Sequence, residues 1–234
     1  MSHRESVKAT VKVILTGPDG KVLKVIEGEN PDPFNWYLVY MITLNIWGPY
    51  TETWVVDAFG NTYYFDFYTS SPQTSMGYLV SGFCLTGCPN TGSTPPNAPG
   101  IWLFSSTPPG GADYSVSPPI TVYQDAYASS PSFIAGLSYS PLNVNYGGNA
   151  ATSPGEVLYV SYIISQSITN TLSSPVDVYT IFLVGAVYGS LSQSPVYMPV
   201  TFYVFSPPIV FSPGTTMTVT VTLNFPIGVA GPYI

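Results

Sequence analysis

The second half of the chain constrains the fold most, because it consists of stretches with the alternation of β-strands. Residues 215–225 (TTMTVTVTLNF) alternate threonine with apolar side chains, the period of two expected when one sheet face is buried and the other is exposed. Five further stretches read in the same way: 118–127, 132–140, 156–170, 175–189 and 195–205. Strands at this spacing, with turn residues between them, predict a mainly β fold, an antiparallel β-sandwich of the jelly-roll type.

Two β-hairpins are predicted in the first half of the chain. Residues 7–16 (VKATVKVILT) and 21–27 (KVLKVIE) are rich in β-branched residues and alternate, and Gly17-Pro18-Asp19-Gly20 between them is a turn sequence. Residues 51–58 and 61–68 flank a second short turn. We expect the first hairpin to end at residue 27, where EGENP leads into the next element.

Residues 32–48 are predicted to form a helix. Asp32 suits the N-cap, Pro33 suits the first helical position, and Gly48-Pro49 is a stop signal. Nearly every face is apolar, and the residues expected to pack in the core are Phe34, Trp36, Leu38, Ile42 and Trp47. About 15 residues reach about 22 Å, which is too short to cross a bilayer core. The helix is therefore a buried core element, or else one that binds a membrane surface or a partner.

Between the second hairpin and the strand expected at 101–106 (IWLFSS), the sequence changes character. Ser, Thr, Pro, Asn and Gly dominate residues 69–100, apart from one apolar run at 76–85. This composition predicts an exposed, loop-rich insert. We expect a single β-sandwich domain over 1–234, with an N-terminal basic hairpin at 1–27, a core helix at 32–48 and the insert at 69–100.

Charge is scarce and unevenly distributed. Only 7% of residues are charged, and all five basic residues lie in the first 24 positions: Arg4, Lys8, Lys12, Lys21 and Lys24. Lys8, Thr10 and Lys12 alternate with the apolar residues Val7, Ala9, Val11 and Val13, as on the exposed face of a half-buried strand. The alternative is a basic arm that contacts an acidic partner, nucleic acid or a membrane surface. A surface with few ion pairs also suits a strongly acidic exterior, where carboxylates are protonated.

Cys84 and Cys88, in FCLTGC, are the only cysteines. A lone C-x3-C pair makes a poor zinc site, because a structural zinc needs four ligands. The two alternatives are a local disulfide that pins a loop and two unpaired thiols. The N-terminal sequence lacks the apolar region of a signal peptide. Because the composition nevertheless suits an acidic exterior, we expect the protein to leave its cell inside a particle such as a virion.

Binding is a better expectation than catalysis. The only histidine is His3, and no nucleophile elbow, phosphate-binding loop or dinucleotide fingerprint is present. The carboxylates show no pairing in sequence: Asp57, Asp66, Asp113, Asp125, Glu156 and Asp177. We therefore expect no enzyme, cofactor or metal site. Tyrosine and asparagine in loops suit contacts with sugars or proteins, and Tyr114 (in 107–114) and Tyr146 (in 143–149) are the candidate loop contacts.

Several segments in order resemble the virion structural proteins of viruses of thermoacidophilic archaea, with related patterns in tailed-phage fibre and head-decoration proteins. The segments are GKVLKVIEG, DPFNWYLVYMI, IWLFSSTPPGGADYSVSPPI, VSYIISQSITNTLSSPVDVYTIFLVG and FSPGTTMTVTVTLNF. The resemblance implies a β-sandwich or jelly-roll subunit that assembles into rings, turrets, nozzles or shells. It carries over no catalytic residue.

The expected function is therefore that of a virion subunit: a capsid, turret, or nozzle or adaptor protein. It would be made in the host cytoplasm, exposed to an acidic exterior, and partnered by copies of itself, other virion proteins and host surface glycans. The alternative is an extracellular β-sandwich module that binds carbohydrate or a host surface.

Overall fold

The computed structural model describes residues 8–30, 52–56, 62–66, 78–86, 88, 91–106, 133–148, 157–189 and 196–229. This part of the chain is mainly β, with antiparallel sheets and no helix, which confirms the predicted class. The predicted helix at 32–48 and the predicted strand at 118–127 lie outside the described residues.

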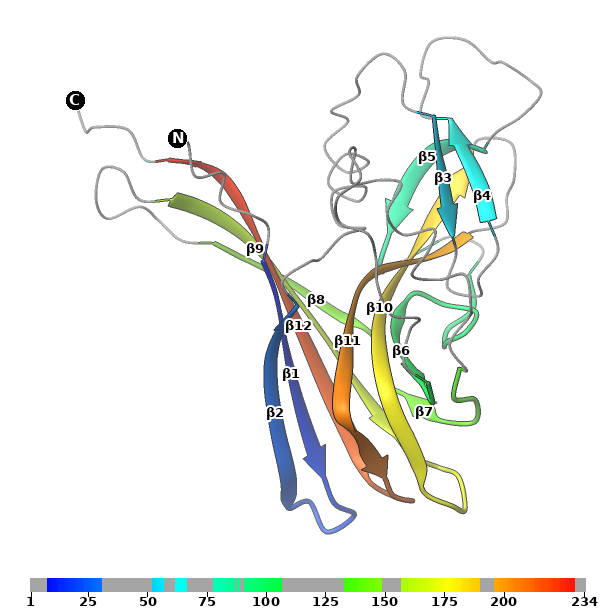
Figure 1. The fold of residues 1–234 in the computed structure, drawn as a ribbon, viewed down its shortest axis with the longest axis vertical. Coiled ribbons are helices and arrows are strands. Elements are labelled where there is room, and N and C mark those ends of the chain that lie inside the picture. Colours follow the sequence, from blue (N-terminus) through cyan, green and yellow to red (C-terminus); the bar gives the residue numbers. More distant parts are fainter. Residues whose placement is uncertain are drawn as a thin grey trace.

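The first sheet contains both the first and the last strand of the described chain. Its strand order is β2 (Val22–Asn30), β1 (Lys8–Thr16), β12 (Thr216–Val229), β9 (Val157–Thr169) and β7 (Ser138–Tyr139), and β8 (Asn143–Gly148) also pairs with β9 (Figure 1). All of these pairs are antiparallel. β1 pairs with β12 from Lys8 opposite Asn224 to Thr16 opposite Thr216, so the first strand lies beside the last.

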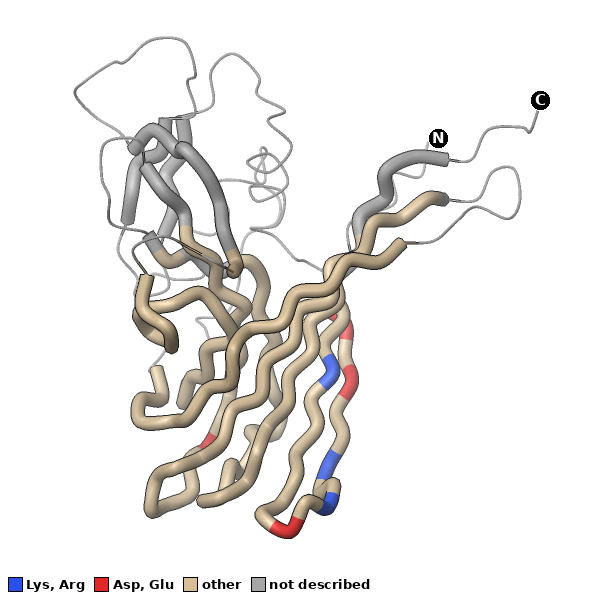
Figure 2. Tube along the Cα trace, turned by 180° about the vertical axis from the view of Figure 1, so that it is seen from behind, with Lys and Arg blue, Asp and Glu red and all other residues tan. Residues whose placement is uncertain are grey.

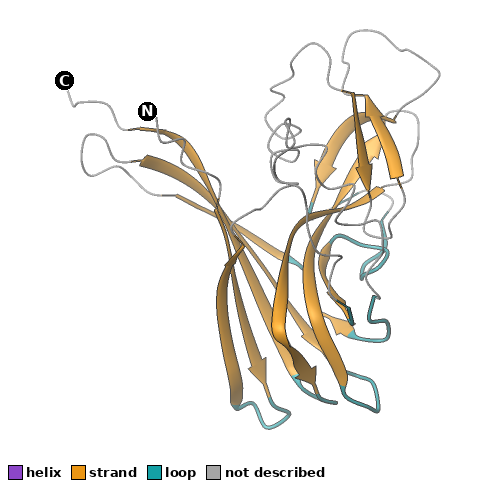
Figure 3. Cartoon of the chain, viewed as in Figure 1, coloured by secondary structure: helices purple, strands orange, loops and turns teal. Residues whose placement is uncertain are grey.

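The second sheet has the order β11 (Val196–Phe211), β10 (Val176–Gly189), β5 (Tyr78–Cys84), β4 (Thr62–Asp66) and β3 (Glu52–Val56), and β6 (Gly100–Phe104) also pairs with β10. Its pairs are antiparallel except β4 with β5, which is parallel. Figure 3 shows that strands and short loops account for the whole described chain. β9 and β12 diverge from β10 and β11 toward one end (Figure 1).

One hydrophobic cluster is shared by both sheets and forms the main core. The first sheet supplies alternate residues of β1 and β12, as the period of two requires, while the second supplies residues of β6, β10 and β11. The fully buried members include Ala9, Val13, Ile101, Leu103, Ile164, Ile168, Val178, Phe211, Met217, Val219 and Leu223. The strict alternation in 215–225 therefore turns its apolar residues toward the other sheet.

A second, smaller cluster lies on the opposite face of β6 and β10. It consists of Trp102, Phe104, Phe182 and Val184, all buried. The Phe104 and Phe182 rings meet edge to face at 4.7 Å, and Trp102 Nε1–H donates to the Ala98 carbonyl at 3.0 Å. Burial on both faces explains why IWLF and TIFLV are continuous apolar runs rather than alternating ones.

Most predicted strands are confirmed, including both hairpins and the stretches at 101–106, 156–170, 175–189, 195–205 and 215–225. Several boundaries were wrong. β11 continues past residue 205 to Phe211, and β12 continues past residue 225 to Val229. The first hairpin does not end at residue 27, because β2 continues to Asn30 opposite Ala9. Of 132–140, only Ser138 and Tyr139 form a strand. The expected loop at 143–149 contains strand β8, whose backbone pairs with β9 although its Asn and Gly residues are typical of turns.

The insert at 69–100 also differs from expectation. It contains strand β5, which pairs with β10 and β4. Its last residues are not an exposed loop, since Ala98, Pro99 and Gly100 are buried. They are covered because Ala98 lies beside Trp102 and because Gly100 begins β6.

Candidate interaction surface

The outer face of the first sheet carries a regular array of hydroxyl groups. Residues between Ile164 and Ile168 on β9, and between Met217 and Leu223 on β12, alternate with buried ones and are partly exposed. We name this array the hydroxyl face; its members are Ser165, Ser167, Thr169, Thr216, Thr218, Thr220 and Thr222. The register aligns them across the two strands, with Thr169 opposite Thr216, Ser167 opposite Thr218 and Ser165 opposite Thr220.

Several of these hydroxyl groups bond to one another. Ser167 Oγ and Thr218 Oγ1 are 2.9 Å apart, and so are Thr169 Oγ1 and Thr216 Oγ1. At the end of the array Ser161 Oγ donates to Asn224 Oδ1 at 2.6 Å. Such cross-strand pairs fix the hydroxyl groups relative to one another across β9 and β12. A hydroxyl that makes one hydrogen bond keeps further acceptor or donor capacity for a partner. None of its seven members is charged, so their own polarity does not change with pH.

Charge in the described chain gathers on the neighbouring β1–β2 hairpin (Figure 2), where Lys12 lies opposite Thr220 on the same face of the sheet. Lys12 Nζ lies 2.7 Å from Glu27 Oε1, and Lys21 Nζ lies 3.3 Å from Asp19 Oδ2. Lys12 is exposed while Val11 and Val13 beside it are buried, which favours the half-buried strand over the free basic arm.

The remaining basic candidates add little to a cationic patch in the described chain. Lys8 is the first residue of β1, and Lys24 lies in β2 opposite Leu15. Arg4 lies outside the described residues. The hairpin is therefore a mixed-charge edge, with carboxylates beside two of its lysines.

Tyr146 lies on strand β8 and not on a loop, which corrects the prediction for this residue. Its side chain is 74% exposed, and its ring meets that of Tyr162 edge to face at 5.0 Å. Burial, and then the neighbouring Tyr146, raise the pKa of Tyr162. The exposed Tyr146 ring, which packs on the partly buried Tyr162, remains a candidate contact point. Tyr114, the other candidate, lies outside the described residues, as do the core-helix residues Phe34, Trp36, Leu38, Ile42 and Trp47.

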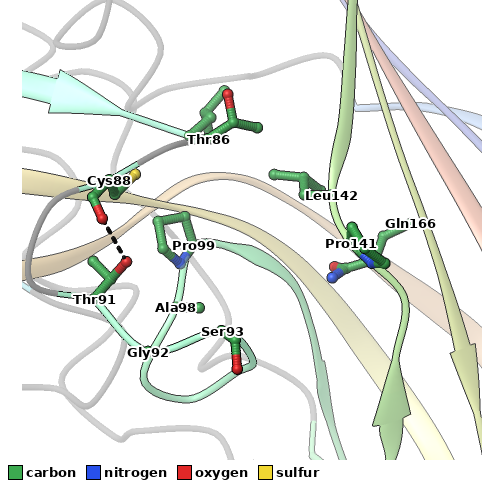
Figure 4. A pocket seen from close by; sticks show the side chains of 11 residues that line it. Thr86, Cys88, Thr91, Gly92, Ser93, Ala98, Pro99, Pro141, Leu142 and Gln166 are labelled. Atoms are coloured by element: carbon green, nitrogen blue, oxygen red, sulfur yellow. Dashed lines mark hydrogen bonds between the residues drawn. The ribbon is translucent and has the colours of Figure 1, made fainter.

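The cysteine loop lines a small cavity of about 210 Å³ (Figure 4). Cys88 is disulfide-bonded, and Cys84 is the only other cysteine in the chain. The Cys88 carbonyl accepts a hydrogen bond from Thr91 Oγ1 at 3.0 Å. The disulfide thus helps to fix a loop against the sheet.

Gln166 is the buried polar residue of this cavity, and both polar atoms of its amide have a hydrogen-bond partner. Oε1 accepts from the Ile101 N–H at 2.7 Å, and Nε2 donates to the Ser140 carbonyl at 2.9 Å. Gly100 allows this approach: its φ is +154°, and a Cβ there would lie 2.8 Å from Gln166 Oε1. Gln166 therefore forms a structural tie between the two sheets at the wall of this cavity.

Sequence reasoning missed two features of this surface. Gln166 stands in a run that reads only as an alternating strand, and nothing local marks it as a link to Ile101. The exposed apolar side chains on β2 were also missed, because VLKVIE has the pattern of any half-buried strand.

In the described ranges, no three His, Cys, Asp or Glu side chains gather in a group that could hold a metal ion. No helix with the length and apolar character of a membrane span occurs in that part of the chain either. Comparison with protein-family models, with curated proteins and with solved structures finds no match.

Proposed function

We propose that this protein is a virion structural subunit, a β-sandwich of the jelly-roll type that assembles with copies of itself. The observation that carries the proposal is the hydroxyl face, an array of uncharged hydroxyl side chains on a sheet that contains both β1 and β12. The cores of protein interfaces contain few charged residues. Hydroxyl groups can hydrogen-bond across such an interface without the cost of removing water from a charged group.

The distribution of charge supports the same proposal. Outside the β1–β2 hairpin, the charged residues of the described chain are Glu52, Asp66 and Asp177. An assembly that packs through neutral faces keeps its contacts when carboxylates become protonated. This fits a particle exposed to an acidic exterior and the resemblance to virion proteins of thermoacidophile viruses.

Electron microscopy of the purified protein at pH 3 and pH 7 tests the proposal. We expect defined rings, tubes or shells at both pH values. Ser165→Lys places a charge in the hydroxyl face and should abolish these assemblies or make them irregular. The control Ser173→Lys, at an exposed loop position after β9, should leave them intact. A wild-type protein that stays monomeric at high concentration contradicts the proposal.

The exposure of Tyr146 favours a second candidate, a module that binds surface carbohydrate, because an exposed tyrosine ring can stack on a sugar. Glycan-array binding tests this candidate. Tyr146→Ala should remove the signal and Tyr146→Phe, which keeps the ring, should retain it; Tyr114→Ala tests the other tyrosine. Equal binding by Tyr146→Ala and wild type argues against a role for this ring.

A further inference from the structure

Strand β2 exposes three large apolar side chains close together. Val22, Leu23 and Val25 are 60%, 61% and 51% exposed. Val25 lies opposite Ile14 and Val22 opposite Thr16, and both partners alternate with the buried residues Val13 and Leu15. A register irregularity between Leu15 and Thr16 sets Val22 on the same outer face as Val25. The patch is therefore a feature of the backbone register and not a frayed end.

β2 is also an edge of its sheet: among the described residues its only strand partner is β1. The strand Val22–Asn30 contains no proline. β11, one edge strand of the second sheet, contains three: Pro199, Pro207 and Pro208. Proline removes a backbone donor and blunts an edge against pairing. Of these two edge strands, β11 is blunted by proline, whereas β2 exposes apolar side chains and is able to pair.

The charges along this edge favour an antiparallel second copy of the strand as its partner. Lysine stands at the start, at Lys21, and glutamates stand at the end, at Glu27 and Glu29. An antiparallel second copy centred on Val25 places Val25 opposite Val25, Leu23 opposite Glu27, and Lys21 opposite Glu29. A parallel copy would place like charges side by side, which destabilises pairing.

We propose that β2 pairs with β2 of a second copy in antiparallel register, around a two-fold axis at Val25. The inner side of β2 does not take part, since Gly28 lies against the Tyr203 ring of β11. Because such an axis is perpendicular to the sheet, the hydroxyl faces of both copies lie on the same side of one continuous sheet. The inference rests on the proposed function, because this dimer would be the unit from which the virion subunit assembles.

Cysteine cross-linking of the full chain tests the axis directly. In Val25→Cys the two introduced thiols face each other, so mild oxidation should give a covalent dimer on a non-reducing gel. Val210→Cys is the matched control, because Val210 is 61% exposed but lies on proline-containing β11. We expect at least a tenfold higher dimer yield for Val25→Cys. Equal yields overturn the proposal.

A charge exchange tests the register. Lys21→Glu alone and Glu29→Lys alone should each weaken the dimer, measured by sedimentation, because each places like charges opposite one another. The double variant Lys21→Glu/Glu29→Lys restores opposite charges and should recover the dimer. Failure of the double variant to recover, with both single variants weakened, overturns this register.

The outcomes separate this inference from the proposed function. Val25→Cys dimers in a protein that never grows beyond a dimer would support the β2 contact and contradict the virion subunit. Rings or shells in a protein whose Val25→Cys variant does not cross-link would overturn the β2 contact and leave the proposed function standing.

Discussion

At the scale of single residues, Gln166 connects the two sheets through hydrogen bonds to the backbone. It is buried and joins the Ile101 N–H of β6 to the Ser140 carbonyl beside β7. A buried backbone group left without a partner costs about 1–3 kcal/mol. We expect Gln166→Leu to lower the free energy of unfolding by about 2–4 kcal/mol, measured by urea denaturation. Ser165→Ala, on the outer face of the same strand, should change it by less than about 0.5 kcal/mol.

Tyr139 is the opposite case, a polar group that the fold does not satisfy. Among the described residues its buried hydroxyl has no hydrogen-bond partner, and burial raises the pKa of Tyr139 above its ordinary value of 10.0. We expect Tyr139→Phe to be as stable as the wild type or up to about 1 kcal/mol more stable at pH 7. A loss of more than about 1 kcal/mol would show that the hydroxyl has a partner after all.

The same residue predicts a response to alkaline pH. Since the pKa of Tyr139 is higher in the folded than in the unfolded chain, the folded state binds more protons above pH 10, and stability falls as pH rises through this range. Tyr139→Phe should reduce that fall, although Tyr162 and Tyr197, whose pKa values burial also raises, will preserve part of it. Melting temperatures between pH 8 and pH 11 measure the difference.

At the scale of elements, β6 has one face in each of the two hydrophobic clusters, as its neighbour β10 does. Trp102 is fully buried on its outer side, against Phe133 at 5.6 Å and Tyr197 at 5.7 Å between ring centroids. We expect Trp102→Ala to lower the free energy of unfolding by about 3–5 kcal/mol, because the cavity cannot collapse between packed rings. Trp102→Phe should lose less. A small effect of Trp102→Ala in urea denaturation would show that the second cluster is dispensable.

At the scale of the whole molecule, packing and neutral hydrogen bonds hold the described chain together, and ion pairs contribute little. Both ion pairs, Lys12 with Glu27 and Lys21 with Asp19, are exposed, and such pairs contribute less than about 1 kcal/mol each. We expect the melting temperature at pH 3 to lie within about 8 °C of that at pH 7. Calorimetry checks this, and a much larger fall at pH 3 would argue against an acidic exterior as the working environment.

Local sequence predicted the strands well where periodicity was strong, as in 215–225 and in the first hairpin. It failed at Asn143–Gly148, whose composition is that of a turn and whose strand exists because β9 offers a partner. It failed again at 98–100, where Trp102 decides burial. The scarcity of charge on the candidate surface could be predicted from the sequence. The arrangement of the hydroxyl groups on one face could not, because it depends on how β9 pairs with β12.

The sequence by itself determined the β class, the alternation that separates a wet face from a core face, and the concentration of positive charge near the start of the chain. These depend on neighbouring residues, and a period of two is visible within a single strand. Only the tertiary structure decided that the first strand lies beside the last, that Gln166 reaches Ile101, and that β2 is an edge with Val22, Leu23 and Val25 exposed. Contacts between distant segments leave no local periodicity, so the edge that we propose as the dimer contact became visible only in the folded chain.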